Sequence, residues 1–188
     1  MDIEVIKKNY YFEKLTEIHE LKDFDCGSVD LNDFIKNDAL RDQKQNLNVT
    51  KLIMFEQKII GFFSLVADSI TIKQLNHEDG AVYKNKIKYK SLPSLKIGRF
   101  ALDKKYTNKG LGSLILLNIN YNIRNIAKEH IGIRFITVDG YAKAYTFYKK
   151  NNFKHFKKHD KDIKNLEKIK ERDPEKTIYM YQDIQMIK

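Results

Sequence analysis

Cysteine, proline and long apolar runs are all scarce in this sequence. The 188 residues include one cysteine, Cys26, so no internal disulfide can form, and we expect a reducing compartment. The longest apolar run, residues 59–67, is about half as long as a membrane-spanning helix. The first residues, Met1–Val5, lack the basic stretch before an apolar core that marks a secretory signal. These absences predict a soluble protein of the cytoplasm that does not enter a membrane.

Segments that would divide the chain are absent as well. With 2 prolines and 8 glycines, the sequence has no linker rich in proline, glycine or serine. No unit of about 20–50 residues repeats. At roughly 150 residues per domain, we expect one domain over residues 1–188. A chain of this length buries about 70% of the surface that its unfolded form exposes, so it needs neither a disulfide nor a metal for stability.

Positive charge is what the sequence has in excess. Lysine and arginine number 35 against 25 aspartates and glutamates, which gives a formal net charge of +10. Such a surplus favours acidic partners, namely nucleic acid, polyphosphate ligands or anionic membrane surfaces. An even spread of lysines over a solvated surface explains the same charge equally well.

Spacing of apolar residues predicts a mixture of helices and strands. Helices are expected at residues 29–35, 36–45, 142–150 and, with the clearest periodicity, from Gly110 onward. Strands are expected at residues 51–56, 58–66, 95–102, 133–138, 153–156 and 177–181, with a tight turn around Gln57. Residues 74–94 are expected to form a loop, and the charged residues 157–176 a helical insertion that Pro174 ends. This order predicts an α/β or α+β fold with a single sheet.

The stretch from Arg99 to Gly112 combines a strand end, a short basic loop and the start of the long helix. Unpaired N–H groups and the positive end of the helix dipole favour phosphate oxygens at such a place. Gly110 and Gly112 let the backbone approach an anion closely. Lys104, Lys105 and Lys109 add positive charge. The stretch therefore predicts a pyrophosphate cradle.

Two familiar phosphate motifs do not fit this loop. A P-loop requires a lysine directly after its second glycine, but Ser113 follows Gly112. A dinucleotide fingerprint requires a third glycine or alanine where this chain has Ile115. On the loop alone, an ordinary turn between a strand and a helix is the simpler interpretation.

A second motif about 35 residues downstream favours a phosphate-binding loop over an ordinary turn. Phe147-Tyr148 is followed after three residues by Asn152-Phe153. With Gly110-x-Gly112, this order and separation resemble the Gcn5-related N-acetyltransferase family. The resemblance implies a central, mostly antiparallel sheet of about six or seven strands flanked by helices, with acetyl-CoA as cosubstrate and no metal. Two positions depart from the family pattern: Thr107 replaces a Gln or Arg, and Asn152 replaces a Gly but tolerates positive φ.

A narrower resemblance involves three further segments. Phe24-Asp25-Cys26-Gly27, Leu31-Asn32-Asp33-Phe34 and residues 95–103 look like the acetyltransferase toxins of bacterial toxin–antitoxin pairs. The match runs from about residue 10 to 156 and leaves the insertion 157–176 outside. It implies acetylation of the α-amine of aminoacyl-tRNA, a block of translation, a homodimer and, where a partner gene exists, a cognate antitoxin. The role of the insertion stays open.

The resemblance also implies roles for particular residues. It implies that backbone groups of one strand and the glycine loop hold coenzyme A: Phe100, Ala101, Leu102, Thr107, Asn108, Lys109, Gly110, Leu111, Gly112 and Ser113. A backbone N–H of that strand would polarise the thioester carbonyl. Tyr148 is the candidate acid for the departing thiolate, because a thiolate leaves poorly without a proton. Without the family, a core aromatic is the simpler interpretation of Tyr148.

The strand before the loop supplies no general base. Many family members have a Glu there, whereas this chain reads Lys96-Ile97-Gly98-Arg99. An α-amine with a pKa of about 8 is partly neutral at pH 7, but a lysine amine near 10.4 is not. The missing carboxylate therefore favours α-amines over lysine side chains, although water or a distant carboxylate could serve as base.

Basic residues suggest a nucleic-acid surface. Lys36, Arg41 and Lys44 share a helix face, and Arg99 lies near the expected cleft, so these four are the candidate tRNA contacts. A solvated helix face is an equally good interpretation. A second candidate is the segment 83–90, which could stack on or pair with RNA ends. It contains Tyr83 and Tyr89 together with Lys84, Lys86, Lys88 and Lys90. The same segment could be a surface loop.

Metal and thiol chemistry have little support. His155 and His159 have helical spacing but no zinc pattern around them, so a solvated turn is expected. Cys26 has no neighbour that suggests a nucleophile and is expected to be a small buried residue. Two alternatives to the toxin-like function stay open: acetylation of a small amine or a protein N-terminus, and a basic RNA-binding module without activity. The acceptor itself cannot be read from the sequence.

Overall fold

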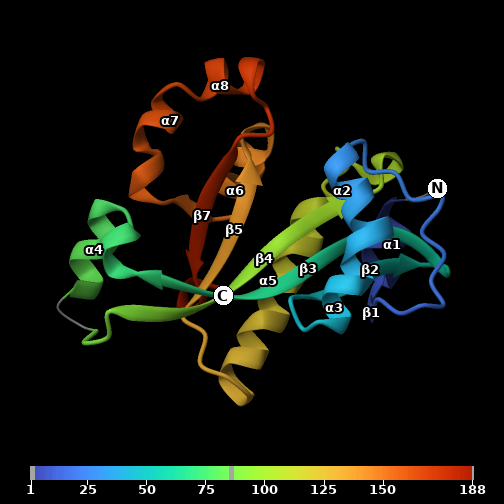
Figure 1. The fold of residues 1–188 in the computed structure, drawn as a ribbon, viewed down its shortest axis with the longest axis horizontal. Coiled ribbons are helices and arrows are strands. Elements are labelled where there is room, and N and C mark those ends of the chain that lie inside the picture. The colour runs from blue at the N-terminus through green and yellow to red at the C-terminus, as the bar shows by residue number, and fades with distance from the viewer. Residues whose placement is uncertain (1–2, 85–86, 188) are drawn as a thin grey trace. The chain divides into compact units, whose positions relative to one another are not determined.

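The structure is a computed structural model that describes residues 3–84 and 87–187 (Figure 1). Its strands follow one another in the sheet as β1-β2-β3-β4-β5-β7-β6. Their bounds are β1 Tyr11–Lys14, β2 Val49–Phe55, β3 Lys58–Thr71, β4 Ser91–Leu102, β5 Phe135–Tyr141, β6 Lys154–His155 and β7 Thr177–Asp183. The expected single, mostly antiparallel sheet flanked by helices is confirmed.

The helices differ widely in length. They are α1 Ile3–Asn9, α2 Val29–Asp33, α3 Ala39–Lys44, α4 His77–Lys84, α5 Leu111–Glu129, α6 Tyr145–Lys150, α7 Asp160–Lys164 and α8 Leu166–Arg172. A π-helical turn, Phe34–Asp38, joins α2 to α3, so the two expected helices 29–35 and 36–45 form one continuous helical stretch. Among the helices of the described ranges, none is both long and apolar enough to cross a membrane.

The β2–β3 hairpin confirms the predicted tight turn. Glu56 and Gln57 both have positive φ, 47° and 59°, as a two-residue hairpin turn of type I′ requires. The strands pair in antiparallel register from Val49↔Leu65 to Phe55↔Lys58, with one shift between Ile53 and Met54.

The chain divides into two compact units. Unit 1 runs up to Val66 and includes Ile97–Leu116, and unit 2 comprises Ala67–Lys96 and the chain from Leu117 onward. Each unit has its own apolar core. The unit 1 core contains Leu15, Phe24, Ile35, Ala39, Leu52, Met54, Phe62 and Ala101. The unit 2 core contains Ile70, Leu75, Leu92, Phe135, Phe156, Tyr179 and Tyr181.

The loop expected at residues 74–94 is wrong for its greater part. Helix α4 begins at His77, where the Asn76 Oδ1 accepts a hydrogen bond from the Asp79 backbone N–H at 2.9 Å. Glu78 and Asp79 in the first turn add favourable interactions with the helix dipole. Gly80 lies within the helix, and β4 already begins at Ser91.

Segment 157–176 is helical as expected, but His155 and His159 do not form the expected solvated turn. His155 lies in β6, whereas His159 ends a 3₁₀ turn. The His159 Nε2 accepts the Tyr179 backbone N–H at 3.1 Å, and its Nδ1 lies 2.9 Å from the Asp162 carboxylate. The imidazole therefore fastens the start of the insertion to β7. Within the described residues, no cluster of histidine, cysteine and carboxylates could hold a metal ion.

Candidate functional site

The loop between β4 and α5 has the backbone that a phosphate cradle needs. After a 3₁₀ turn at Lys104–Tyr106, Asn108 and Gly110 adopt left-handed φ values of 59° and 74°. A Cβ on Gly110 would meet nothing within 4 Å, so backbone conformation is what favours glycine at this position. Helix α5 follows directly with 19 residues, and its first N–H groups have no partner within the helix.

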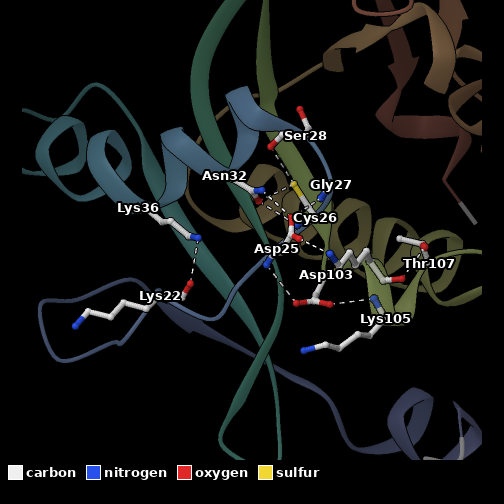
Figure 2. A network of polar contacts seen from close by, with 11 residues as sticks. Lys22, Asp25, Cys26, Gly27, Ser28, Asn32, Lys36, Asp103, Lys105 and Thr107 are labelled. Atoms are coloured by element: carbon white, nitrogen blue, oxygen red, sulfur yellow. Dashed lines mark hydrogen bonds and ion pairs between the residues drawn. The ribbon is translucent and has the colours of Figure 1, made fainter.

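The buried side chain of Asp103 holds the start of this loop in place by hydrogen bonds. Its side chain is buried, with 3% of the residue exposed. One carboxylate oxygen accepts the Lys105 N–H at 2.9 Å, and the other accepts the Asp25 N–H at 3.3 Å. The Lys104 N–H donates to the Asp25 carbonyl oxygen at 2.9 Å. Figure 2 shows how these bonds join segment 22–28 to the loop within unit 1.

The Asp25 carboxylate holds the same loop. We call Asp25, Asn32 and Asp103 together the brace. Its Oδ1 accepts the Gly27 N–H and the Asn32 side-chain amide, each at 2.8 Å. Its Oδ2 lies 2.6 Å from the Lys104 ammonium. The hydrogen bond from Lys104 and those from Asn32 and Gly27 hold the pKa of Asp25 well below its usual range. The Asp-Cys-Gly and Leu-Asn-Asp segments that suggested a toxin-like enzyme therefore contribute a structural element that holds the loop.

The charge of the loop suits an anionic ligand. Lys109 donates through its Nζ to the Lys105 carbonyl oxygen at 2.9 Å, and the Thr107 hydroxyl donates to the Lys104 carbonyl at 3.0 Å. The carboxylate that begins the loop, Asp103, points into the fold. The N–H groups at the start of a helix, a left-handed glycine and lysine ammonium groups together fit the pyrophosphate of coenzyme A.

The strand that leads into the loop is tightly packed. Ala101 and Leu102 are 8% and 9% exposed. A Cβ on Gly61 of β3 would lie 2.6 Å from the Ala101 carbonyl oxygen, so the two strands pass each other where a side chain has no room. This packing fixes the position of the β4 backbone at the residues expected to contact the thioester.

Tyr148 lies on α6 in unit 2. Its ring packs edge-on against Phe147 and Phe153, at centroid distances of 5.1 and 5.7 Å. Two ring carbons lie only 2.8 Å from where a Cβ on Gly140 would be, so glycine at 140 makes room for the ring. Burial raises the pKa of Tyr148 above its usual value. No group in residues 3–84 or 87–187 hydrogen-bonds its hydroxyl, which leaves that O–H available to a ligand.

The turn after α6 confirms the expectation for Asn152. This residue has φ 68°, in the left-handed region where family members have glycine. The turn closes with the Phe153 N–H donating to the Tyr148 carbonyl at 3.1 Å. The Phe-Tyr segment keeps its shape despite the substitution.

Two of the three basic residues on the proposed helix face form ion pairs, and the third donates a hydrogen bond to a backbone carbonyl. Arg41 forms ion pairs with Asp38 at 2.8 Å and Asp42 at 3.2 Å. Lys44 pairs with Glu17, and the Lys36 ammonium donates to the Lys22 carbonyl oxygen at 3.1 Å (Figure 2). Each of the three expected tRNA contacts on this face therefore already has a partner within the protein.

Arg99 has a more distinctive setting. Its guanidinium lies over the Phe34 ring at 5.2 Å, and its Nη1 donates to the Gly98 carbonyl at 3.0 Å. Its buried Nε forms no hydrogen bond with any described residue, and the Asp30 carboxylate is 4.0 Å away. A buried donor without a partner favours an incoming acceptor.

The segment 83–90 separates into residues with different environments. Tyr83 lies in α4 and hydrogen-bonds Asp183, while Arg134 lies over its ring at 5.0 Å, so a stacking role in RNA binding is wrong for this tyrosine. Tyr89 is 77% exposed. Lys86 lies outside the described residues.

Solved structures of similar shape identify the fold. The chain superposes on AtaT complexed with acetyl-methionyl-tRNAfMet with a TM-score of 0.75, at 20% identity over 95% of this chain and 97% of that one. A mutant of KacT gives 0.75 at 18% identity, over 95% and 97% of the two chains. AtaTR bound with AcCoA gives 0.70 at 22%, over 96% of each. The chain has the Gcn5-related N-acetyltransferase fold.

Sequence comparison also gives a relation. The tRNA-acetylating toxin of Mycobacterium tuberculosis (strain ATCC 25618 / H37Rv) is 24% identical over 137 residues, which cover 72% of this chain and 78% of the toxin. No protein-family model matches the chain.

Three residues of this acetyltransferase-fold site were not anticipated as functional. Asp25, Asn32 and Asp103 form the brace under the loop, although all three had served only as marks of resemblance in the sequence. Asp103 follows a strand and precedes a basic turn, which is the position of a capping aspartate, and this signal was available in the sequence.

Proposed function

We propose that this protein is an acetyl-CoA-dependent N-acetyltransferase that transfers acetyl directly to the α-amine of aminoacyl-tRNA. The left-handed, aspartate-braced loop that opens α5 carries the proposal, because it occurs in a chain with the fold of AtaT and KacT. AtaT was solved with acetyl-methionyl-tRNAfMet, and AtaTR with AcCoA. The relative in Mycobacterium tuberculosis is a tRNA-acetylating toxin.

Acetyl-CoA would supply an acetyl group activated as a thioester. The N–H groups of Leu111, Gly112 and Ser113, with Asn108, Gly110 and the lysine ammonium groups of the loop, would hold its pyrophosphate. Backbone N–H groups of Phe100, Ala101 and Leu102 would orient the carbonyl and stabilise the negative charge that develops on its oxygen. Thr107 contributes less than the family's Gln or Arg, because its hydroxyl is already donated to Lys104.

Tyr148 would hold the proton that the sulfur takes up. Its raised pKa keeps the phenol protonated throughout the neutral range, so the proton is present when it is needed. Two of the structural relatives, KacT and AtaT, were solved as tyrosine-to-phenylalanine mutants, so in both proteins a tyrosine hydroxyl was removed by substitution. A core role alone does not require a hydroxyl.

The acceptor amine must arrive neutral. Strand β4 has no carboxylate in its sequence, so it offers no general base to deprotonate a lysine amine. The α-amine of an aminoacyl ester loses its proton far more readily than lysine. This favours aminoacyl-tRNA over protein lysines, and Arg99, whose Nε makes no hydrogen bond within the described residues, is the residue we assign to an acceptor phosphate or carbonyl.

Partners and location follow from the same proposal. Charged tRNA and acetyl-CoA occur together in the cytoplasm, where the protein would act as one domain over residues 1–188. AtaT was solved with the C-terminus of the antitoxin AtaR, and we propose a comparable peptide partner and a homodimer for this chain.

The deciding experiment is transfer of radiolabelled acetyl from acetyl-CoA to bulk charged tRNA, with deacylated tRNA as control. Label that depends on aminoacylation and is lost after ester hydrolysis supports the proposal. Binding of acetyl-CoA without label would favour a small-molecule or peptide acceptor. Absence of acetyl-CoA binding would leave a basic RNA-binding module and refute the enzyme.

A further inference from the structure

Unit 2 contains a concave surface lined by lysines, which we call the lysine pocket. Its larger part, of about 760 Å³, lies beside α4, and its smaller part, of about 410 Å³, shares Lys73 and Lys157 with it. Five lysines line the two parts: Lys73, Lys84, Lys90, Lys157 and Lys158. None of the residues that line either part is an aspartate or a glutamate.

These lysines differ from several others of unit 2 in their surroundings. Within the described residues, none of the five forms an ion pair, whereas Lys143, Lys154 and Lys176 of the same unit each contact a carboxylate at 2.7–2.9 Å. Lys158 lies over the Tyr179 ring at 5.2 Å. The pocket thus gathers positive charge without internal compensation, which is unfavourable unless an anion is bound.

The rim and floor of the lysine pocket suit a nucleic-acid strand. Tyr89 lines it with its residue 77% exposed, so the ring offers a flat surface on which an unpaired base can stack. The floor includes the apolar Ile72 and the buried Leu75. Lysines that bind successive phosphates beside an aromatic ring are typical of binding to single-stranded RNA.

We infer that the lysine pocket holds backbone phosphates of the RNA substrate, with Tyr89 stacking on an unpaired base. The inference rests on the proposed function for the identity of the RNA as tRNA. It replaces the helix face of Lys36, Arg41 and Lys44, whose side chains already have partners within the protein, as the main RNA contact. Coenzyme A phosphates and acidic peptides are the competing anions.

The test compares two triple variants that lose the same charge. Lys73→Ala/Lys90→Ala/Lys157→Ala removes pocket lysines, and Lys8→Ala/Lys58→Ala/Lys128→Ala removes exposed lysines elsewhere. Each lowers the formal charge from +10 to +7 (10 − 3). Binding of fluorescent deacylated bulk tRNA is measured by anisotropy at several salt concentrations, and thermal melting checks that both variants are folded.

The pocket variant should bind deacylated tRNA at least about tenfold more weakly, with a salt slope reduced by roughly one per lysine removed. The matched variant should stay within about threefold of wild type. Equal losses in the two variants, or no loss in either, would refute the inference. A weaker affinity for acetyl-CoA in the pocket variant, or competition by polyglutamate equal to that by RNA, would refute it too.

A second variant tests the aromatic contact. Tyr89→Ala should weaken binding of a short single-stranded RNA about tenfold, Tyr89→Phe should preserve it, and binding of duplex RNA should not change. Equal effects on single strands and duplexes would remove the stacking role.

The proposed function is tested separately, by measuring acetyl transfer to charged tRNA with the wild-type protein. If transfer is absent while pocket-dependent tRNA binding is present, the proposed activity fails and the RNA surface stands. If transfer is present but binding does not depend on the pocket, the activity stands and the inference fails.

Discussion

Gly140 and Gly132 have opposite surroundings although they lie only a few residues apart. A Cβ at Gly140 would press into the Tyr148 ring at 2.8 Å, whereas a Cβ at Gly132 would meet nothing within 4 Å. The aromatic ring is held between Phe147, Phe153 and this strand, so it cannot move away without disturbing its neighbours.

We therefore expect Gly140→Ala to destabilise the fold by about 1–3 kcal/mol and to lower kcat, because the displaced ring carries the proposed acid. Gly132→Ala is the matched control and should change neither. Urea unfolding and steady-state acetyl transfer measure the two effects. Equal behaviour of the two variants would contradict the tight contact.

Tyr148→Phe removes the hydroxyl and keeps the ring. We expect kcat to fall by about 10²- to 10⁴-fold, with the dissociation constant for acetyl-CoA unchanged. Since burial raises the pKa of Tyr148, the phenol stays protonated as pH rises, and wild-type kcat should show no alkaline decline from this group below about pH 10. Unchanged turnover in the variant would assign the proton to water.

At the scale of elements, the brace joins segment 22–28 to the β4–α5 loop. The spacing of apolar residues in the sequence does not reveal this connection. Asp103 is buried and satisfies two backbone N–H groups that would otherwise have no partner. Its position in the fold makes the loop rigid before any ligand binds.

Asp103→Ala should destabilise the protein by about 2 kcal/mol or more, because it leaves buried donors unpaired, and should raise the KM for acetyl-CoA. Asp103→Asn keeps one acceptor oxygen and should lie between the alanine variant and wild type. Chemical denaturation and acetyl-CoA titration test this order. A KM unaffected by Asp103→Ala would show that the loop does not need its brace.

Asp25 makes the same element sensitive to acid. Its folded-state pKa is lowered chiefly by Lys104, then by Asn32 and Gly27, so its contribution to stability is present above the unfolded value of about 3.9. That contribution disappears as pH falls below about 4 toward the folded pKa. Asp25→Asn should be less stable at pH 7 and should lose less stability than wild type on acidification. Parallel pH profiles of the two proteins would contradict this.

Elements with strong periodicity were predictable, and those that depend on side-chain capping or distant pairing were not. The apolar face of α5 and the β2–β3 hairpin follow from local spacing. Helix α4 was missed because its start depends on Asn76 and its apolar residues are few. Strand β1 is four residues long and is a strand only because it pairs with β2, which no local pattern records.

The backbone of the candidate site was predictable at Gly110 and Asn152, whereas the roles of the loop, of Tyr148 and of the basic residues stay predictions. Gly110 and Asn152 have the positive φ that their positions imply. The charges of Arg41 and Lys44 looked available in the sequence, yet Asp38 and Glu17 neutralise them in space.

For the whole molecule, the formal charge of +10 predicts different salt responses for the two proposed substrates. The KM for charged tRNA should rise steeply, by about 10³-fold or more between roughly 50 and 200 mM salt if six or more phosphates are contacted. The KM for acetyl-CoA, with far fewer phosphates, should rise much less. Kinetics at fixed pH measure both. Parallel responses would show that the net charge serves coenzyme A alone.

Both units are built from separated stretches of sequence, and this governs when the protein can become active during its synthesis. Strand β7, near the end of the chain, lies between β5 and β6 and is the neighbour to which β6 pairs. A nascent chain that has not yet extended past Thr177–Asp183 lacks the strand that supports β5, and β5 carries the glycine against which Tyr148 packs. An enzyme proposed to stop translation therefore cannot complete its fold before β7 has been synthesised. Until then, its product would not halt the ribosome that makes it.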